Sequence, residues 1–169
     1  MSYIQINDDS LSQQYIEDII GDYISGLTGL DRNSIRPAHQ PIHPILKQNE
    51  TICVFNIHRS ETKGFWSGVN NKLYSERTEL YIHIFFYGLN GFECVNKLIK
   101  GSFIQQNSYE LANKNMSVMK FTDIYEIPVN INGIEILRHD VTMKVSLARN
   151  ISYNGTYFNN NPQINVNGG

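Results

Sequence analysis

The side chains that could carry chemistry in this 169-residue sequence are few, and they do not form a familiar site. His39 and His43 have the i, i+4 spacing that places two metal ligands on one helix face, but Pro41 between them is incompatible with a helix interior. His139 and Asp140 could orient a general base, yet no nucleophile stands in a recognisable setting. We therefore predict no catalytic, metal-binding or cofactor-binding residues.

Composition and charge restrict the class of protein further. Hydrophobic residues make up 41% and charged residues 18%, which is typical of a globular protein. The net charge of −2 and the pI near 6.2 argue against a protein that coats nucleic acid. We see neither a signal peptide nor a membrane span, so we expect a protein made in a cytoplasm without membrane partners. Cys53 and Cys94 stand in apolar contexts and are predicted to be buried thiols.

The stretch 75–87 has the strongest strand pattern, because its alternate residues form one aliphatic and one aromatic row. The aliphatic row is Leu80, Ile82, Ile84 and Phe86, and the other row is Tyr81, His83, Phe85 and Tyr87. A strand that is apolar on both faces is usually central in its sheet. The aromatic row then needs a cover from loops, from a proline-rich segment or from a neighbouring molecule. His83 in that row is interpreted as a hydrogen-bonded packing residue.

The other patterned stretches predict two helices and three more strands. One helix is capped by Asp8, Asp9 or Ser10 and runs to about Gly26, and the second follows Asn90. Strands are expected at 51–58, 119–129 and from Ile134, where Asn132-Gly133 forms a two-residue hairpin turn.

These elements predict a single α+β domain at 1–152 and an Asn/Gly-rich tail at 153–169. The domain is a four-stranded, largely antiparallel sheet with two helices on one face, in the order αββ-αββ. Residues 59–74 are a polar connection within a long protruding hairpin, and residues 107–114 add a short helical turn.

Residues 31–49 contain three prolines and are predicted to form an irregular, extended strap. After the leucine–glycine turn Leu27-Thr-Gly-Leu-Asp31, this strap reads Ile35-Arg-Pro-Ala-His-Gln-Pro-Ile-His-Pro44. The arrangement resembles the tailed-phage neck and tail terminator proteins, in which a helix and a similar turn precede a hydrophobic-Arg-Pro-x-x-Gln-Pro-x-x-Pro run. His39 stands where the family often has tryptophan, and the resemblance covers residues 10–152. The matching residues are Ile35, Arg36, Pro37, Gln40, Pro41 and Pro44.

The resemblance implies a structural virion protein of the phage neck, not an enzyme. Such proteins form a ring, commonly a hexamer, at the head-proximal end of the tail. The ring ends tail-tube growth, joins the tail to the head connector, and leaves a channel through which DNA passes without specific binding. Two alternatives remain: a portal-to-tail adaptor, and a small-molecule-binding or enzymatic domain on a ferredoxin-like sheet.

Within such a ring, we predict that the strap residues above lie at a subunit interface, because prolines reduce the entropy lost on docking. Phe65 and Trp66 on the hairpin are further interface candidates, with Trp66 as a buried anchor. The long strands would leave unpaired edges, which a neighbour's hairpin could cover in a head-to-tail contact. A basic channel would bind phosphate, so we expect a neutral or acidic lumen that uses Glu61, Glu76 and Glu79.

Overall fold

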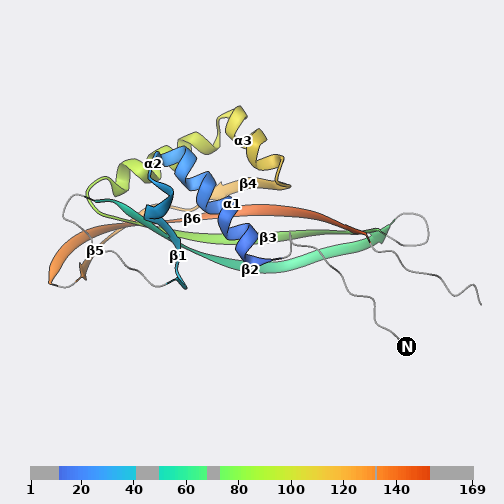
Figure 1. Ribbon diagram of the computed structural model, residues 1–169, viewed down its shortest axis with the longest axis horizontal. Coiled ribbons are helices and arrows are strands. Elements are labelled where there is room, and N and C mark those ends of the chain that lie inside the picture. The colour runs from blue at the N-terminus through green and yellow to red at the C-terminus, as the bar shows by residue number, and fades with distance from the viewer. Residues whose placement is uncertain (1–11, 41–49, 68–72, 132, 153–169) are drawn as a thin grey trace, which may run out of the picture.

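The computed structural model describes residues 12–40, 50–67, 73–131 and 133–152. They form one six-stranded sheet with three α-helices on one of its faces (Figure 1). The helices are α1 (Gln13–Thr28), α2 (Gly91–Ser102) and α3 (Gln105–Ala112), with a 3-10 turn at Arg32–Ser34. The strands are β1 (Ile35–Pro37), β2 (Ile52–Ser67), β3 (Leu73–Tyr87), β4 (Met116–Phe121), β5 (Tyr125–Ile131) and β6 (Ile134–Ser152).

The strand order is β1-β2-β3-β6-β4, and β5 also pairs with β6. All pairs are antiparallel except β1 with β2. The prediction of four strands and two helices is therefore wrong. Three local misreadings explain the difference: a strand in the strap, two strands where one was expected, and a full α3 helix in place of a short turn.

The first additional strand is β1, which lies in the proline-containing strap that was expected to be irregular. Ile35 pairs with Cys53 and Pro37 with Phe55, at the outer edge of the sheet. Proline is tolerated on an edge strand because its missing N–H can face away from the ladder. The second arises because 119–129 is two strands, β4 and β5, which pair one after the other along β6.

The core lies between the helices and the aliphatic row of β3, as the alternation predicts. Leu80, Ile82, Ile84 and Phe86 have no exposed surface. They pack with Ile16, Ile20 and Ile24 of α1, Val95 and Leu98 of α2, and Val141, Met143 and Val145 of β6. Burial of side chains this size stabilises the fold by about 1.5–3 kcal/mol each. Cys53 and Cys94 are free thiols in this core, which confirms their prediction, and burial raises the pKa of both.

Helix α1 has clear end signals, although not the predicted ones. Its N-cap is Ser12, whose hydroxyl accepts a hydrogen bond of 3.1 Å from the N–H of Tyr15. The proposed caps Asp8, Asp9 and Ser10 lie outside the described residues. Gly29 ends the helix with φ of 76°, a left-handed conformation that glycine adopts without a steric penalty.

None of the helices in the described residues lies on the other face of the sheet, and β6 supplies charged side chains that cover its aromatic row. The Arg138 guanidinium lies 5.2 Å from the ring centre of Phe85, and the Lys144 ammonium lies 5.2 Å from that of Tyr81. Asp140 accepts two 2.7 Å hydrogen bonds from Arg138, and these raise the pKa of Arg138. Among the described residues, these cation–π contacts partly cover the aromatic row, whose members are half-buried.

Two extensions project from opposite ends of the sheet (Figure 1). The first, here called the arm, consists of residues 62–67 of β2, 73–78 of β3 and 147–152 of β6. The predicted polar connection at 59–74 is thus mostly strand, and the protrusion has three strands where a hairpin was expected. The second is the β5–β6 hairpin, residues 125–140. Ile131 pairs with Ile134 and Gly133 has φ of 83°, as the two-residue turn predicts, while Asn132 lies outside the described residues.

Candidate functional site

The strap lies against both the sheet edge and helix α1. The N–H of Ala38 donates a 2.7 Å hydrogen bond to the carbonyl of Phe55, which extends the β1–β2 contact. The side chains of Ile35 and Pro37 are buried within the chain. His39 Nδ1 lies 3.6 Å from Oε1 of Glu17, a buried residue of α1. Residues 35–39 are therefore held in one position by backbone and side-chain contacts.

The polar candidates of the strap lie closer to the surface. Arg36 and Gln40 are half-buried, and Arg36 Nε donates to the carbonyl of Asn33 over 3.3 Å. The N–H of Gln40 donates to the carbonyl of Pro37 over 3.1 Å. Pro41 and Pro44 lie outside the described residues.

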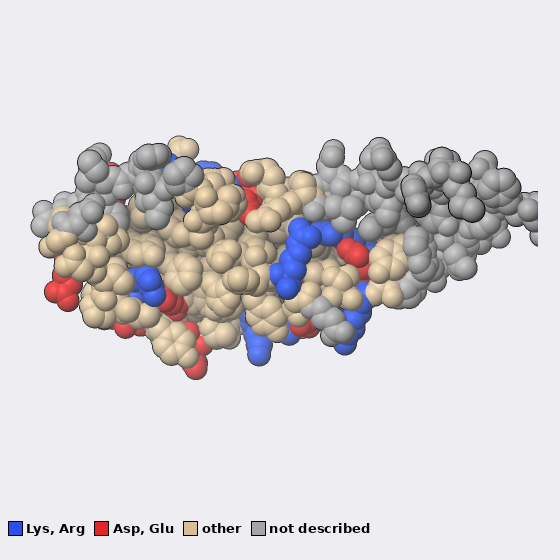
Figure 2. Space-filling model, turned by 90° about the horizontal axis from the view of Figure 1, so that it is seen from below, with Lys and Arg blue, Asp and Glu red and all other residues tan. Residues whose placement is uncertain are grey.

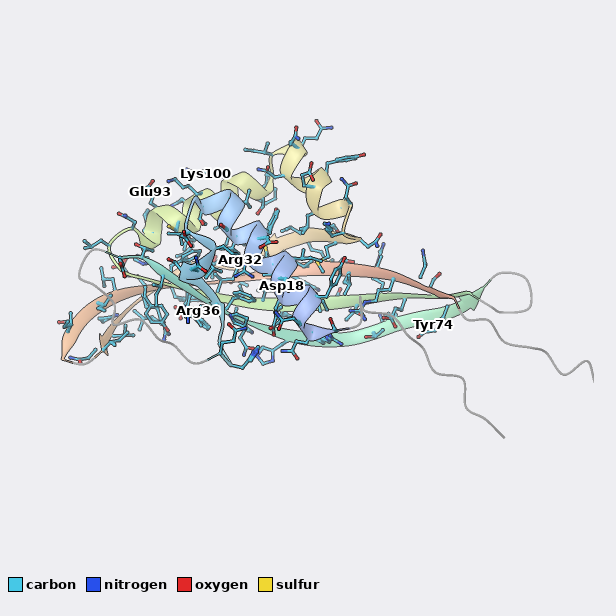
Figure 3. The ribbon with its side chains drawn as sticks, in the orientation of Figure 1. Asp18, Arg32, Arg36, Tyr74, Glu93 and Lys100 are labelled. Carbon is cyan, nitrogen blue, oxygen red and sulfur yellow. The ribbon has the colours of Figure 1, made fainter. Side chains whose placement is uncertain are left out.

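Arg32 positions the start of the strap, and sequence reasoning missed it. Its Nε donates to Oδ1 of Asp22 over 2.8 Å, and its Nη1 donates to the carbonyl of Ile35 over 3.0 Å. Its Nη2 lies 3.6 Å from Asp18, and Figure 3 shows Arg32 and Asp18 close together on neighbouring elements. A Cβ on Gly21 would collide with this guanidinium. A glycine inside a helix was therefore the available signal that another group packs closely there.

The arm contains a buried ion pair. Arg149 Nη1 donates to Glu76 Oε1 over 3.3 Å, with 7% of the Arg149 side chain and 12% of the Glu76 side chain exposed. Beside it, the hydroxyls of Thr62 and Thr78 are 3.0 Å apart, within hydrogen-bonding distance. Glu76 was expected to line a channel, but within one chain its charge is already compensated. Glu79, on the opposite face of β3, likewise pairs with Lys144 over 2.7 Å.

The opposite face of the arm carries two exposed cations. Lys63 and Arg77 lie directly opposite each other on β2 and β3 and flank a hollow of about 420 Å³. Neither forms an ion pair within the described part of the chain. The candidates Phe65, Trp66 and Glu61 belong to β2, but their side chains lie outside the described part of the structure.

A comparison with models of known protein families identifies the family of this chain. A family model described as phage neck terminator protein matches residues 14–168. The chain belongs to the phage neck terminator family. This confirms the resemblance inferred from the Arg-Pro strap. No protein in the search of curated proteins matches the sequence.

Membership of this family makes the chain a structural protein of the phage neck, located in the virion beside tail and head components. None of the helices in the described residues is long and apolar enough to cross a membrane. No group of three or more potential metal-ligating His, Cys, Asp or Glu side chains occurs within the described part.

The histidines that the structure describes make structural contacts. His83 Nδ1 is 2.9 Å from the Thr142 hydroxyl, which bears out its interpretation as a hydrogen-bonded packing residue. Its ring lies 5.2 Å from that of His58, and burial followed by the charge of His58 lowers the pKa of His83. His139 is buried and its Nε2 is 3.1 Å from Oε2 of Glu126, while His43 lies outside the described residues.

Proposed function

We propose that this chain forms a closed ring at the head-proximal end of the tail, where it ends tail-tube growth and joins the tail to the head connector. The observation that carries the proposal is the match to the neck terminator family over residues 14–168. A ring of six subunits, by analogy with related terminators, would surround the channel through which DNA leaves the head.

The shape of the chain supports a head-to-tail contact between subunits. The arm extends the sheet beyond its helical layer, whereas the β5–β6 hairpin extends it at the other end (Figure 1). Contacts between two different surfaces of identical subunits close into a ring when the rotation between neighbours permits. An arm that reaches the next subunit also explains strands of 15–19 residues, which exceed the roughly 5–6 residues typical of globular domains.

The two sheet edges differ in how they accept another strand. β2 extends beyond its short contact with β1, and no strand of the described residues pairs with its outer edge there, so this edge could accept an added strand. The edge formed by β4 and β5 is blunted by an irregularity between Val118 and Lys120 and by Pro128 in mid-strand. Contact at the β4–β5 edge is therefore better made by side chains.

The channel is proposed to be neutral or acidic, because DNA must pass without binding. Glu61 is the stronger lining candidate, and Glu76 and Glu79 contribute less because Arg149 and Lys144 neutralise them. A channel wall dominated by Lys63, Lys72 and Arg77 in an imaged ring would contradict this assignment.

The proposal is tested by imaging the purified protein and by removing it from the phage. Negative-stain images and native mass measurement should show a discrete ring. Phage without the protein should accumulate unjoined heads together with tail tubes of uncontrolled length, and a plasmid copy should restore both phenotypes. Unjoined tails of normal length would favour the adaptor role instead.

A further inference from the structure

The two ends of the molecule carry opposite charge. In the arm, Arg149 is offset by Glu76, which leaves Lys63 and Arg77 as a net charge of +2. In the β5–β6 hairpin, Arg138 is offset by Asp140, and two glutamates leave a net charge of −2. On the helix-free face, most Lys and Arg atoms lie toward the arm and most Asp and Glu atoms toward the other end (Figure 2).

The cations of the arm are placed where they repel each other. Lys63 and Arg77 are a directly opposed cross-strand pair, and like charges in this position destabilise a sheet. Both are exposed, and Ser75, Ala148 and Asn150 line the hollow beside them. An acidic partner would offset the repulsion that the isolated subunit retains.

The hairpin end offers an apolar surface with an acidic border. Leu89, Phe92 and Leu137 are 76%, 56% and 46% exposed, unusually high for large apolar side chains that lie close together. The N–H of Gly88 donates to the carbonyl of Leu137, which places Leu89 beside that strand.

Phe92 completes the connection to the acidic border. Its ring is 5.9 Å from that of His139, whose Nε2 contacts Glu126 at 3.1 Å. Glu126 and Glu135 are exposed and fall on the same strand face as Leu137 and His139. We call Leu89, Phe92, Leu137, Glu126 and Glu135 the acidic-rimmed patch.

We propose that the acidic-rimmed patch of one copy receives the arm of a second copy, with Lys63 and Arg77 against Glu126 and Glu135. This inference rests on the proposed ring and specifies its subunit contact. The opposite charges of the two ends select a second copy of this chain as the occupant. Because the arm and the patch lie at opposite ends of the molecule, each subunit donates to one neighbour and receives from another (Figure 1). The apolar residues of the patch supply burial at the contact.

Charge reversal tests this contact. An arm variant carries Lys63→Glu and Arg77→Glu, and a patch variant carries Glu126→Lys and Glu135→Lys. Each alone should raise the concentration needed for half-assembly by about tenfold or more, because like charges then meet across the interface. A 1:1 mixture should assemble with alternating subunits, since each reversed end then finds its complement. A control with Lys114→Glu and Lys120→Glu makes the same net-charge change as the arm variant elsewhere on the surface and should assemble like the wild type.

A second measurement requires no substitution and applies if a variant does not fold. Wild-type protein from isotopically distinct batches is mixed and treated with a zero-length amine–carboxylate cross-linker. Mass spectrometry should find Lys63 joined to Glu126 or Glu135 in mixed-isotope peptides.

The experimental outcomes distinguish an error in the proposed contact from an error in the proposed ring. Rings that form normally in both variants, without this cross-link, overturn the contact and leave the ring. If the protein forms open-ended oligomers whose assembly responds to charge reversal as predicted, the proposed ring is overturned and the proposed contact is supported. A wild type that stays monomeric, with no cross-link and no complex in the variant mixture, overturns both.

Discussion

Arg149 donates a hydrogen bond from Nη1 to Oε1 of Glu76 over 3.3 Å, and the pair is buried inside the arm. The Nε of Arg149 has no hydrogen-bond partner among the described residues. Among the described residues, the guanidinium therefore depends on one carboxylate for compensation, in a segment that none of the described helices covers.

Glu76→Ala should lower the free energy of unfolding by about 3 kcal/mol, because it leaves a buried, unpaired guanidinium. Glu79→Ala is the matched control, since Glu79 lies on the same strand and also pairs with β6, but its side chain is 36% exposed. That change should cost less than about 1 kcal/mol. Denaturant unfolding of both variants measures the difference, and equal losses would show that burial of the Glu76 pair is unimportant.

Lys63→Glu should stabilise the unassembled subunit while it weakens assembly. The new carboxylate would stand directly opposite Arg77 and replace repulsion by attraction, a gain of about 0.2–1 kcal/mol. Lys63→Gln, which removes the repulsion without adding attraction, should fall between it and the wild type. Unfolding is measured at dilutions where only monomer is present. A loss of monomer stability on Lys63→Glu would contradict the assigned register.

The stability of the subunit should fall on acidification in part through His83. Its pKa is lowered in the folded state by burial and by the charge of His58, so the unfolded chain takes up the proton first. This contribution is present above the unfolded value of about 6.5 and is lost as the pH falls from there through the lowered pKa of the folded state. His83→Gln should therefore lose less stability than the wild type between pH 7 and pH 5, and His58→Gln should show a smaller reduction of the same kind. Unfolding curves that shift equally with pH in wild type and His83→Gln would refute this assignment.

Deletion of residues 60–73, replaced by a short Asn-Gly turn, should abolish ring closure and leave the core folded. The deletion removes the outer arm, whereas Leu80, Ile82, Ile84 and Phe86 keep their contacts with the helices. Trp66 is the only tryptophan, so fluorescence of the wild type should report its loss of solvent exposure on assembly. A folded deletion variant that still forms closed rings would contradict the proposed role of the arm in ring closure.

Substitution of the strap should separate its packing role from its proposed interface role. Arg36→Ala and Gln40→Ala alter half-buried side chains and should impair assembly and tail joining with little change in monomer stability. Ile35→Ala removes a side chain that is 1% exposed and should cost about 2–5 kcal/mol of stability. Normal phage assembly with both Arg36→Ala and Gln40→Ala would make the strap a structural linker only.

The sequence by itself determined the features whose signal is local. The alternation in 80–87 identified both the central strand and the face that the helices cover, because strand side chains point alternately to the two faces. The turn glycine before Ile134 and the apolar face of α1 could also be predicted from the sequence alone. The order of the Arg-Pro strap after that helix was specific enough to indicate the family.

Pairing between distant segments was decided only by the tertiary structure. The strand in the strap exists because Ile35–Pro37 meets Cys53–Phe55, and three residues beside a proline carry no strand pattern of their own. The charges of the arm show the same limit. Up to Arg59, the β2–β3 register would place Lys63 opposite Glu76, but the irregularity between Arg59 and Thr62 shifts the register by one and places it opposite Arg77. Glu76 pairs instead with Arg149, because a one-residue shift changes every later cross-strand neighbour and residue types alone do not reveal where it occurs.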